Sequence, residues 1–185
     1  MLTTPNPALL IIDVQHAIDH FSILERSNPD MEEKLADTLA KWRAAKHPII
    51  HVRHSSKSHD SPYHKTSPFY EFKEAVMPLA DEIIITKQEN TAFINTELDQ
   101  TLQAMNITEL VIFGVLTNHS IDATVRVGAA LGYNIFLPLD LTAAGAITLL
   151  DGTVINSEDA QKIYLSNLDG EYCKVCYSKD LFLTF

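Results

Sequence analysis

Six short apolar segments recur along the chain and alternate with amphipathic helical patterns. They are rich in Val, Ile, Leu and Phe, which favour strands, and they cover residues 8–14, 48–53, 82–86, 109–115, 134–139 and 172–177. Strands that are apolar along their whole length are typical of parallel sheets with helices on both faces. The alternation therefore predicts a doubly wound α/β fold with three layers, α/β/α, around a mainly parallel six-stranded sheet.

Segments with helical periodicity separate these strands, at residues 31–47, 97–105, 118–131 and 157–168. Gly132 is a common residue just after a helix, and Ser157 is a favoured N-cap. Pro138 predicts that the fifth strand ends early, because proline donates no hydrogen bond within a sheet. The long stretch 54–81, which contains several Ser, His and Pro residues, is predicted to be a surface loop that can wall a pocket.

The size and charge of the chain limit its functions. Its 185 residues, 46% of them hydrophobic, suit one core, so a single domain over residues 1–185 is expected. The apolar run 110–116 is far shorter than the roughly 20 residues that span a bilayer, and the N-terminus lacks the basic start of a secretory signal. The net charge of -10, without a Lys/Arg cluster, argues against nucleic-acid binding. We expect a soluble, cytoplasmic protein without membrane or nucleic-acid partners.

The two cysteines, Cys173 and Cys176, have the C-x-x-C spacing that is redox-active in thioredoxin-like proteins. There the motif opens a helix, whereas here it lies in a short apolar segment near the C-terminus. Both cysteines are therefore predicted to be structural residues of the core. No G-x-G-x-x-G motif follows the first strand, so a dinucleotide is disfavoured, and we predict no cofactor.

Ligands of doubly wound sheets bind beyond the carboxyl ends of the strands. Asp13 closes the first predicted strand, Lys87 closes the third, and Ser120 begins the helix after the fourth. Each residue alone has an ordinary explanation, as a turn cap, a solvated cation or a helix-start residue. Together, an acid or base, a cation and a hydroxyl at one edge of a sheet are the components of an active site.

These residues lie in three runs, ALLIIDVQ with Asp13, ITKQENTAF with Lys87, and VIFGVLTNHSIDATVRVGAALGY with Ser120. In this order and at these separations, the runs resemble the isochorismatase-like, or cysteine hydrolase, superfamily, and more closely its short amidohydrolase-like members. The resemblance covers nearly the whole chain. It implies a six-stranded α/β hydrolase that forms dimers or larger oligomers such as tetramers. It also implies a small-molecule substrate, an amide, ureido or carbamoyl compound whose C–N bond is cleaved.

The resemblance also assigns roles. Asp13 matches the family's acid/base, Lys87 its catalytic lysine, and Ser120 the position of the nucleophilic cysteine, which this chain lacks. A non-proline cis peptide of the family matches Val115–Leu116. It would aim backbone N–H groups near Leu116 and Ser120 at a developing oxyanion.

In the mechanism that the family implies, Asp13 takes a thiol proton, the thiolate attacks the carbonyl, and Asp13 returns the proton to the departing amine. Lys87 would keep Asp13 ionised. A serine hydroxyl is much less acidic than a thiol, and serine hydrolases normally supply a histidine base. His119 adjoins Ser120, but consecutive helix positions point about 100° apart, so His119 is a poor base and is assigned to the substrate pocket.

Three interpretations of Ser120 stay open, and we favour them in the following order. It is an engineered replacement of a native cysteine, made to hold substrate without turnover. It belongs to an enzyme that needs no nucleophile, as in isochorismatases, which hydrolyse a vinyl ether with Asp and Lys. Or it marks a binding protein that has lost catalysis.

Four further residues are assigned to the substrate pocket. Gln15 shares a strand face with Asp13 and is expected to orient it. Phe93 matches the Phe of the family's small-Ala-Phe position, and the resemblance implies that it walls the pocket. Arg53 and His54 are expected to contact a carboxylate or carbonyl of the substrate.

One geometric demand concerns Lys87. If the strand order is 3-2-1-4-5-6, the third strand lies about 10 Å from the first, and the lysine must reach inward.

No metal is predicted. Nicotinamidases of the superfamily bind a metal through an Asp-x-His pair and a further His, but the matching region here reads His51-Val-Arg-His54. Residues three apart on a strand point to opposite faces, so these two histidines cannot share a metal. His59 and His64, in the long loop, are not expected to be ligands either.

Overall fold

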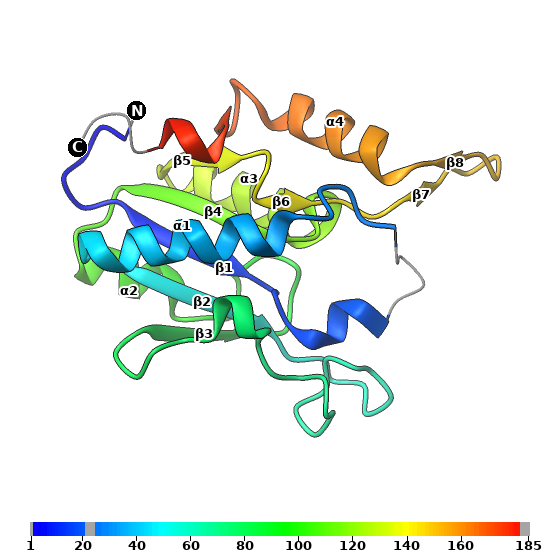
Figure 1. Ribbon diagram of the computed structural model, residues 1–185, viewed down its shortest axis with the longest axis horizontal. Coiled ribbons are helices and arrows are strands. Elements are labelled where there is room, and N and C mark those ends of the chain that lie inside the picture. The colour runs from blue at the N-terminus through cyan, green and yellow to red at the C-terminus, as the bar shows by residue number, and fades with distance from the viewer. Residues whose placement is uncertain (1, 21–24, 182–185) are drawn as a thin grey trace.

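A parallel sheet organises the fold of the computed structural model, which describes residues 2–20 and 25–181 (Figure 1). Its strands are β1 (Ala8–Ile12), β2 (Ile49–His54), β3 (Ile83–Lys87), β4 (Glu109–Val115), β5 (Asn134–Pro138), β6 (Thr142–Ala143) and β9 (Lys174–Cys176). The strand order is β3-β2-β1-β4-β5-β9, and the short β6 pairs with the end of β4. The predicted fold class is confirmed, with seven strands rather than six. Residues 1, 21–24 and 182–185 of the predicted domain lie outside the described residues.

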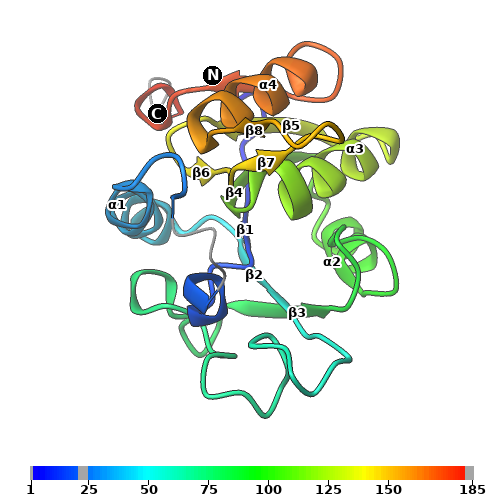
Figure 2. The ribbon, with the colours of Figure 1, turned by 90° about the vertical axis from the view of Figure 1, so that its right-hand side faces the viewer.

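Helices cover both faces of the sheet (Figure 2). Helix α1 (Met31–Ala45) packs on one face through Leu35, Leu39 and Trp42, all fully buried. On the other face, α2 (Leu98–Ala104), α3 (Asp122–Ala130) and α4 (Ser157–Leu168) bury apolar side chains against the sheet. The sheet is therefore apolar on both sides, as the continuous apolar strand segments indicate.

Two predicted elements differ from the structure at the edge that matters for function. Strand β1 ends at Ile12 rather than at residue 14, because Asp13 has a positive φ of 56° that turns the chain. The predicted helix 118–131 begins as one π-helical turn, Thr117–Ile121, and α3 itself starts at Asp122. Wide turns of this kind are frequent at functional sites.

The contact between β1 and β4 is unusually close at Gly114, which pairs with Ile12. A Cβ atom at Gly114 would lie 2.1 Å from the Ile12 carbonyl oxygen, and the φ of Gly114 is 120°. Only glycine fits this position. Its lack of a side chain lets the end of β1, and with it Asp13, approach the turn that carries Ser120.

Shorter elements complete the carboxyl end of the sheet. A 3-10 helix, η1 (His16–His20), follows Asp13, and another, η2 (Glu74–Val76), lies in the predicted loop. The antiparallel hairpin of β7 (Ile147–Thr148) and β8 (Val154–Ile155) precedes α4. A final 3-10 helix, η4 (Ser178–Asp180), ends the described chain. None of the described helices is both long and apolar enough to cross a bilayer.

The cysteines are buried and unpaired, Cys173 in the cluster on one face of the sheet and Cys176 in the cluster on the other. Burial raises the pKa of the Cys173 thiol to about 12 and that of Cys176 to about 11. Both thiols therefore stay protonated at neutral pH, and their prediction as structural core residues is confirmed.

Candidate active site

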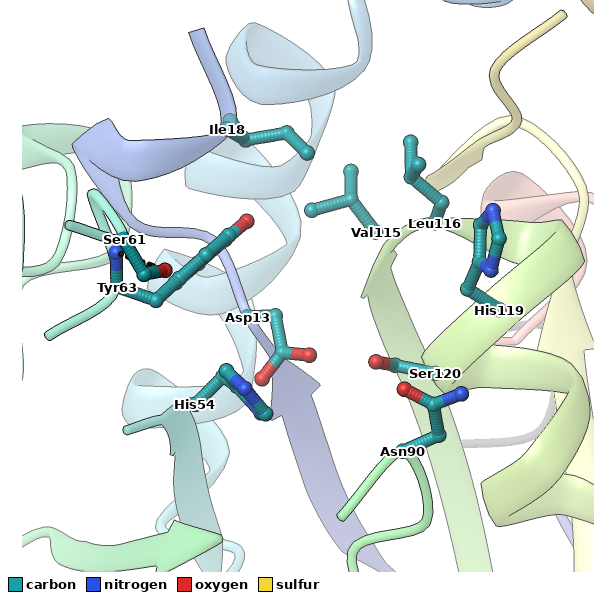
Figure 3. Close-up of a pocket in the computed structure, with 10 residues that line it drawn as sticks. All are labelled: Asp13, Ile18, His54, Ser61, Tyr63, Asn90, Val115, Leu116, His119 and Ser120. Carbon is teal, nitrogen blue, oxygen red and sulfur yellow. Dashed lines mark hydrogen bonds between the residues drawn. The ribbon is translucent and has the colours of Figure 1, made fainter. Parts of the chain in front are cut away.

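Asp13, Lys87 and Ser120 meet at the carboxyl edge of the sheet. Asp13 directly follows β1, Lys87 is the last residue of β3, and Ser120 lies in the π-helical turn after β4. The Asp13 carboxylate and the Ser120 hydroxyl face each other across a pocket in Figure 3. The three side chains are buried, Lys87 completely. The structure thus brings together the three residues that the sequence singled out.

The Lys87 ammonium bridges the other two groups. It donates to Asp13 Oδ2 at 2.6 Å, to Ser120 Oγ at 3.1 Å and to the Glu89 carbonyl at 3.2 Å. The side chain therefore makes the inward reach that the strand order demands. An ammonium has three N–H donors, and each has an acceptor here. The geometry makes Lys87 a fixed positive charge between an acid and a hydroxyl.

One carboxylate oxygen of Asp13 is left over. Oδ1 is buried and has no hydrogen-bond partner among the described residues, although Asp13 lines the pocket. Buried polar atoms without a partner are rare and costly in proteins. A ligand in the pocket that carries an N–H or O–H group would satisfy this oxygen, which is the natural acceptor for a proton in a reaction.

The turn that carries Ser120 is fixed by its own backbone. The Val115–Leu116 peptide bond is cis, and the Leu116 carbonyl accepts hydrogen bonds from the N–H groups of His119 and Ile121. The Asn118 side chain accepts from the Gly145 N–H at 3.1 Å and donates to its carbonyl at 3.4 Å. These contacts tie the turn to the segment after β6 and hold Ser120 at the pocket.

The pocket has a volume of about 370 Å³. Its walls are largely apolar, from Ile18, Val115 and Leu116, and its rim is polar. The lining residues are Asp13, Ile18, His54, Ser61, Tyr63, Asn90, Val115, Leu116, His119 and Ser120. Of the predicted pocket residues, His54 and His119 lie here. Ser61 and Tyr63 come from the loop that the sequence marked as a pocket wall.

Two lining side chains are held in their neutral forms. Burial lowers the pKa of His54, and the Lys87 charge lowers it further, so this imidazole is neutral at neutral pH. Burial and the Asp13 charge raise the pKa of the Tyr63 hydroxyl, which therefore keeps its proton. Both groups act as neutral hydrogen-bonding partners.

Gln15 and Arg53 do not do what the sequence predicted. The Gln15 amide accepts from the His54 N–H at 2.8 Å and donates to the Tyr70 carbonyl at 2.6 Å, so it orients His54 and not Asp13. It does so because β1 ends before it. The Arg53 guanidinium lies 4.8 Å from the centre of the Tyr70 ring and donates to Thr86 Oγ1 at 3.1 Å. Neighbouring strand residues face opposite sides, so His54 faces the pocket and Arg53 does not.

Phe93 is also outside the pocket. Its ring is buried in the core, stacked on Tyr133 at 5.6 Å between ring centres, and close to Gly128. The prediction of Phe93 as a pocket wall was wrong, because its ring packs into the hydrophobic core. Sequence reasoning missed Ile18, Ser61, Tyr63 and Asn90 as individual residues. Asn90 was recoverable, since it lies three residues after Lys87 in the run ITKQENTAF.

Among residues 2–20 and 25–181, no group of three or more His, Cys, Asp or Glu side chains could hold a metal ion. His51 instead contacts Glu82 Oε2 at 2.8 Å. The Nδ1 atom of His64 contacts Thr66 Oγ1 at 2.8 Å. That the purified protein carries no metal stays a prediction, which elemental analysis tests.

Comparison with known proteins places the chain in a family. A family model described as the isochorismatase domain matches residues 7–157. A putative hydrolase of the isochorismatase family from Chromobacterium violaceum has a solved structure with a TM-score of 0.95 and 39% identity, over 97% of this chain and 93% of that one. The isochorismatase family protein YrdC of Bacillus subtilis is 33% identical over 178 residues, 96% of this chain and 95% of its own.

A shorter match has a named activity. The ureidoacrylate amidohydrolase RutB of Cronobacter sakazakii is 38% identical over 64 residues, which is 35% of this chain and 28% of that protein. The domain match covers most of the chain, and similarity to the solved hydrolase and to YrdC extends over nearly all of it. The chain belongs to the isochorismatase family of hydrolases.

Proposed function

We propose that this hydrolase cleaves the C–N bond of a small amide, ureido or carbamoyl compound at the site of Asp13, Lys87 and Ser120. The observation that carries the proposal is the Lys87 bridge, which leaves Asp13 Oδ1 at the pocket without a hydrogen-bond partner in the part of the chain that the structure describes. An amide N–H is a donor that would satisfy this oxygen. The local similarity to a ureidoacrylate amidohydrolase supports the same type of reaction, hydrolysis of a C–N bond.

The bond changes follow from the positions of these groups. The nucleophile at residue 120 bonds to the carbonyl carbon, and its proton passes to Asp13 Oδ1. The C–N bond then breaks, and Asp13 returns this proton to the departing nitrogen. A water oxygen next bonds to the acyl carbon while Asp13 takes a water proton. The acyl bond to residue 120 breaks, and Asp13 restores the proton to that side chain.

Lys87 supplies charge rather than a proton in this scheme. Its three N–H groups are engaged, and it lies within hydrogen-bond distance of both the base and the attacking atom. A buried positive charge stabilises the negative charge that moves between these two atoms. Backbone N–H groups near Leu116 and Ser120 would hold the oxyanion.

A serine hydroxyl gives up its proton to a carboxylate much less readily than a thiol does. The site is therefore better matched to cysteine chemistry, and Ser120 limits the first step. Replacing Ser120 by Cys should raise the rate of amide hydrolysis at least about tenfold and give an acyl-enzyme adduct. Ser120→Ala, which keeps the pocket but removes the nucleophile, should give neither.

The experiment is a hydrolysis panel of small primary amides, ureido acids and isochorismate. The native chain, Ser120→Cys and Ser120→Ala are compared, with intact-mass detection of adducts. Release of ammonia or an amine by Ser120→Cys, through a covalent adduct, supports the proposal. Release of pyruvate from isochorismate by the native chain, with no amide turnover by any form, would replace it with vinyl-ether hydrolysis. Binding of amides without turnover by any form would leave a binding protein.

A further inference from the structure

The charges around the pocket bear on which amides it accepts. Among the described residues that line it, Asp13 carries the formal negative charge, and no Lys or Arg side chain lines it. Lys87 lies behind Asp13, fully buried, with its N–H groups already engaged. Among the described residues, an entering ligand therefore meets the Asp13 carboxylate but no accessible Lys or Arg side chain.

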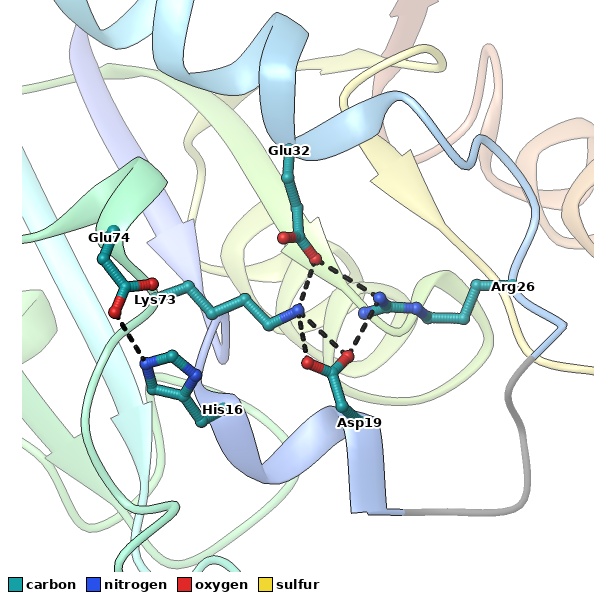
Figure 4. Close-up of polar contacts among 6 residues, drawn as sticks. All are labelled: His16, Asp19, Arg26, Glu32, Lys73 and Glu74. Carbon is teal, nitrogen blue, oxygen red and sulfur yellow. Dashed lines mark hydrogen bonds and ion pairs between the residues drawn. The ribbon is translucent and has the colours of Figure 1, made fainter.

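Lys57 and Lys65, on the same loop as Ser61 and Tyr63, are exposed and are not among the residues that line the pocket. Three other cations close to the lining elements are bound elsewhere. Lys73 donates to Asp19 Oδ1 at 2.9 Å and to Glu32 Oε1 at 2.7 Å, and Arg26 donates to the same two carboxylates at 3.2 Å. Figure 4 shows these four side chains as one ion network beside η1. Arg53, next to the lining residue His54, lies over Tyr70 instead of in the pocket.

This arrangement makes a carboxylate a poor ligand. A buried carboxylate without a cation or several donors is strongly disfavoured, and here it would also face Asp13. His54 cannot compensate, because burial and the Lys87 charge lower its pKa and keep it neutral. The net charge of -10 opposes the approach of anions as well.

We infer that the pocket selects uncharged amides and rejects substrates that carry a carboxylate, an inference that rests on the proposed amide hydrolysis. The apolar walls formed by Ile18, Val115 and Leu116 suit a short aliphatic acyl group. The neutral hydroxyl of Tyr63 and the Asn90 amide at the rim suit a second neutral polar group. By the same reasoning, ureido acids and isochorismate, which is an anion, are excluded.

Glutaramide and glutaramate test the inference, because they share a chain length and an amide and differ in one terminal group, an amide or a carboxylate. Their hydrolysis is measured with Ser120→Cys. The value of kcat/KM should be at least about tenfold higher for glutaramide. Equal values, or a preference for glutaramate, would overturn the inference and leave the proposed amide hydrolysis standing.

If neither compound is hydrolysed, the proposed hydrolysis of these amides fails, and binding decides the inference separately. Ligand-observed NMR with the native chain gives a Kd for each compound. Glutaramide should bind at least about tenfold more tightly than glutaramate. Equal affinities, tighter binding of glutaramate or no binding of glutaramide would each contradict charge selection.

A variant that adds the missing cation provides the reverse test. Asn90 is exposed at the pocket rim, so Asn90→Lys is expected to fold. It should move the glutaramide-to-glutaramate ratio at least about fivefold toward glutaramate, in kcat/KM or in Kd. Asn90→Gln adds length without charge and should keep the original ratio. An unchanged ratio in Asn90→Lys would contradict the electrostatic origin of the selection.

Discussion

The ion pair between Lys87 and Asp13 bears on both the stability of the molecule and its proposed chemistry. Both side chains are buried, and their charged atoms are 2.6 Å apart. Removing two charges from water costs free energy that their attraction only partly returns, so such a pair is weak evidence for stability. Its position at the mouth of the sheet is instead explained by the proposed chemistry.

The substitution Lys87→Met should separate these two roles. It leaves the Asp13 carboxylate buried without its cation, so the free energy of unfolding should fall by about 3–5 kcal/mol. The double variant Lys87→Met/Asp13→Asn removes both charges and should recover much of that loss while remaining inactive. Urea unfolding and the amide assay measure the two effects. Equal free energies of unfolding for Lys87→Met and the native chain would contradict the expected cost of leaving Asp13 buried without its cation.

At this scale, the sequence was most informative about the residues within the three family runs. Asp13, Lys87 and Ser120 could be predicted because each lies at or shortly after the end of an apolar strand segment. Gln15 could not be predicted because its role depends on a single backbone angle, and Arg53 could not because its role depends on which face of β2 meets the pocket. Once the positive φ of Asp13 ends β1, Gln15 no longer shares a strand face with it. Side-chain alternation assigns Arg53 correctly only after His54 is known to face the pocket.

Among the elements, η1 is held by charges as well as by the packing of Ala17 and Ile18. It supplies Ile18 to the pocket, and its Asp19 belongs to the ion network with Arg26, Glu32 and Lys73. The Lys73 side chain is 9% exposed, so this network is partly shielded from solvent. A shielded network of several charges holds an element more firmly than an isolated surface pair does.

Lys73→Met should therefore loosen η1 and the wall that Ile18 forms. KM for the amide substrate should rise about threefold or more, with a smaller change in kcat, because the reacting groups lie on other elements. Amide hydrogen exchange in residues 16–20 should increase. Lys34→Met is the matched control, since Lys34 pairs with Asp30 at 2.7 Å but lies on the surface of α1. The same rise in KM in both variants would argue against the network.

Short elements account for most of what the sequence could not predict. Strands β6, β7 and β8 are two residues each, too short for a periodic pattern. The π-helical turn at residues 117–121 also follows no sequence rule used for helices, since its residues read as the first turn of α3. The longer strands were predicted because they are continuous apolar runs, and the helices because their apolar residues recur with the helical period.

At the scale of the whole molecule, an ion cluster joins helix α1 to the sheet, away from the active site. Glu82, just before β3, accepts from Arg43 of α1 at 2.7 Å and contacts His51 of β2 at 2.8 Å. Burial alone would raise the pKa of Glu82, but the bonds from Arg43, the Leu79 N–H and His51 together lower it from 4.5 to about 2. Burial lowers the pKa of His51 from 6.5.

Acid should therefore destabilise the fold in two stages. Both folded-state pKa values lie below those of the unfolded chain, so each group stabilises the fold at higher pH and loses this effect as pH falls. The His51 contribution starts to fall below pH 6.5, and the Glu82 contribution falls between pH 4.5 and about 2. Urea unfolding at several pH values measures both.

The Glu82→Gln variant tests the second stage. Because it cannot titrate, the loss of stability between pH 4.5 and 2 should be smaller than in the native chain, by about 1–2 kcal/mol. This free-energy difference is smaller than the full pKa difference implies, because Arg43 is partly exposed and solvent screens its charge. Parallel curves for the two proteins would show that Glu82 does not set the acid limit.

The overall architecture was the most predictable level, because alternating strands and helices leave few possible arrangements. The observed strand order is the one that forces Lys87 to reach inward. Association into dimers or tetramers stays a prediction. Exposed apolar side chains such as Leu150 on the β7–β8 hairpin and Ile163 on α4 are candidates for such contacts.

The site draws its parts from two kinds of backbone. The reacting groups lie at or just after the carboxyl ends of parallel strands, whereas Ile18, Ser61, Tyr63 and Asn90 lie on connecting segments. Insertions and deletions are tolerated in such segments and seldom in central strands. In evolution, a descendant of this chain can therefore inherit the same reaction while acquiring a new substrate. Related sequences that share the three runs therefore need not act on the same substrate.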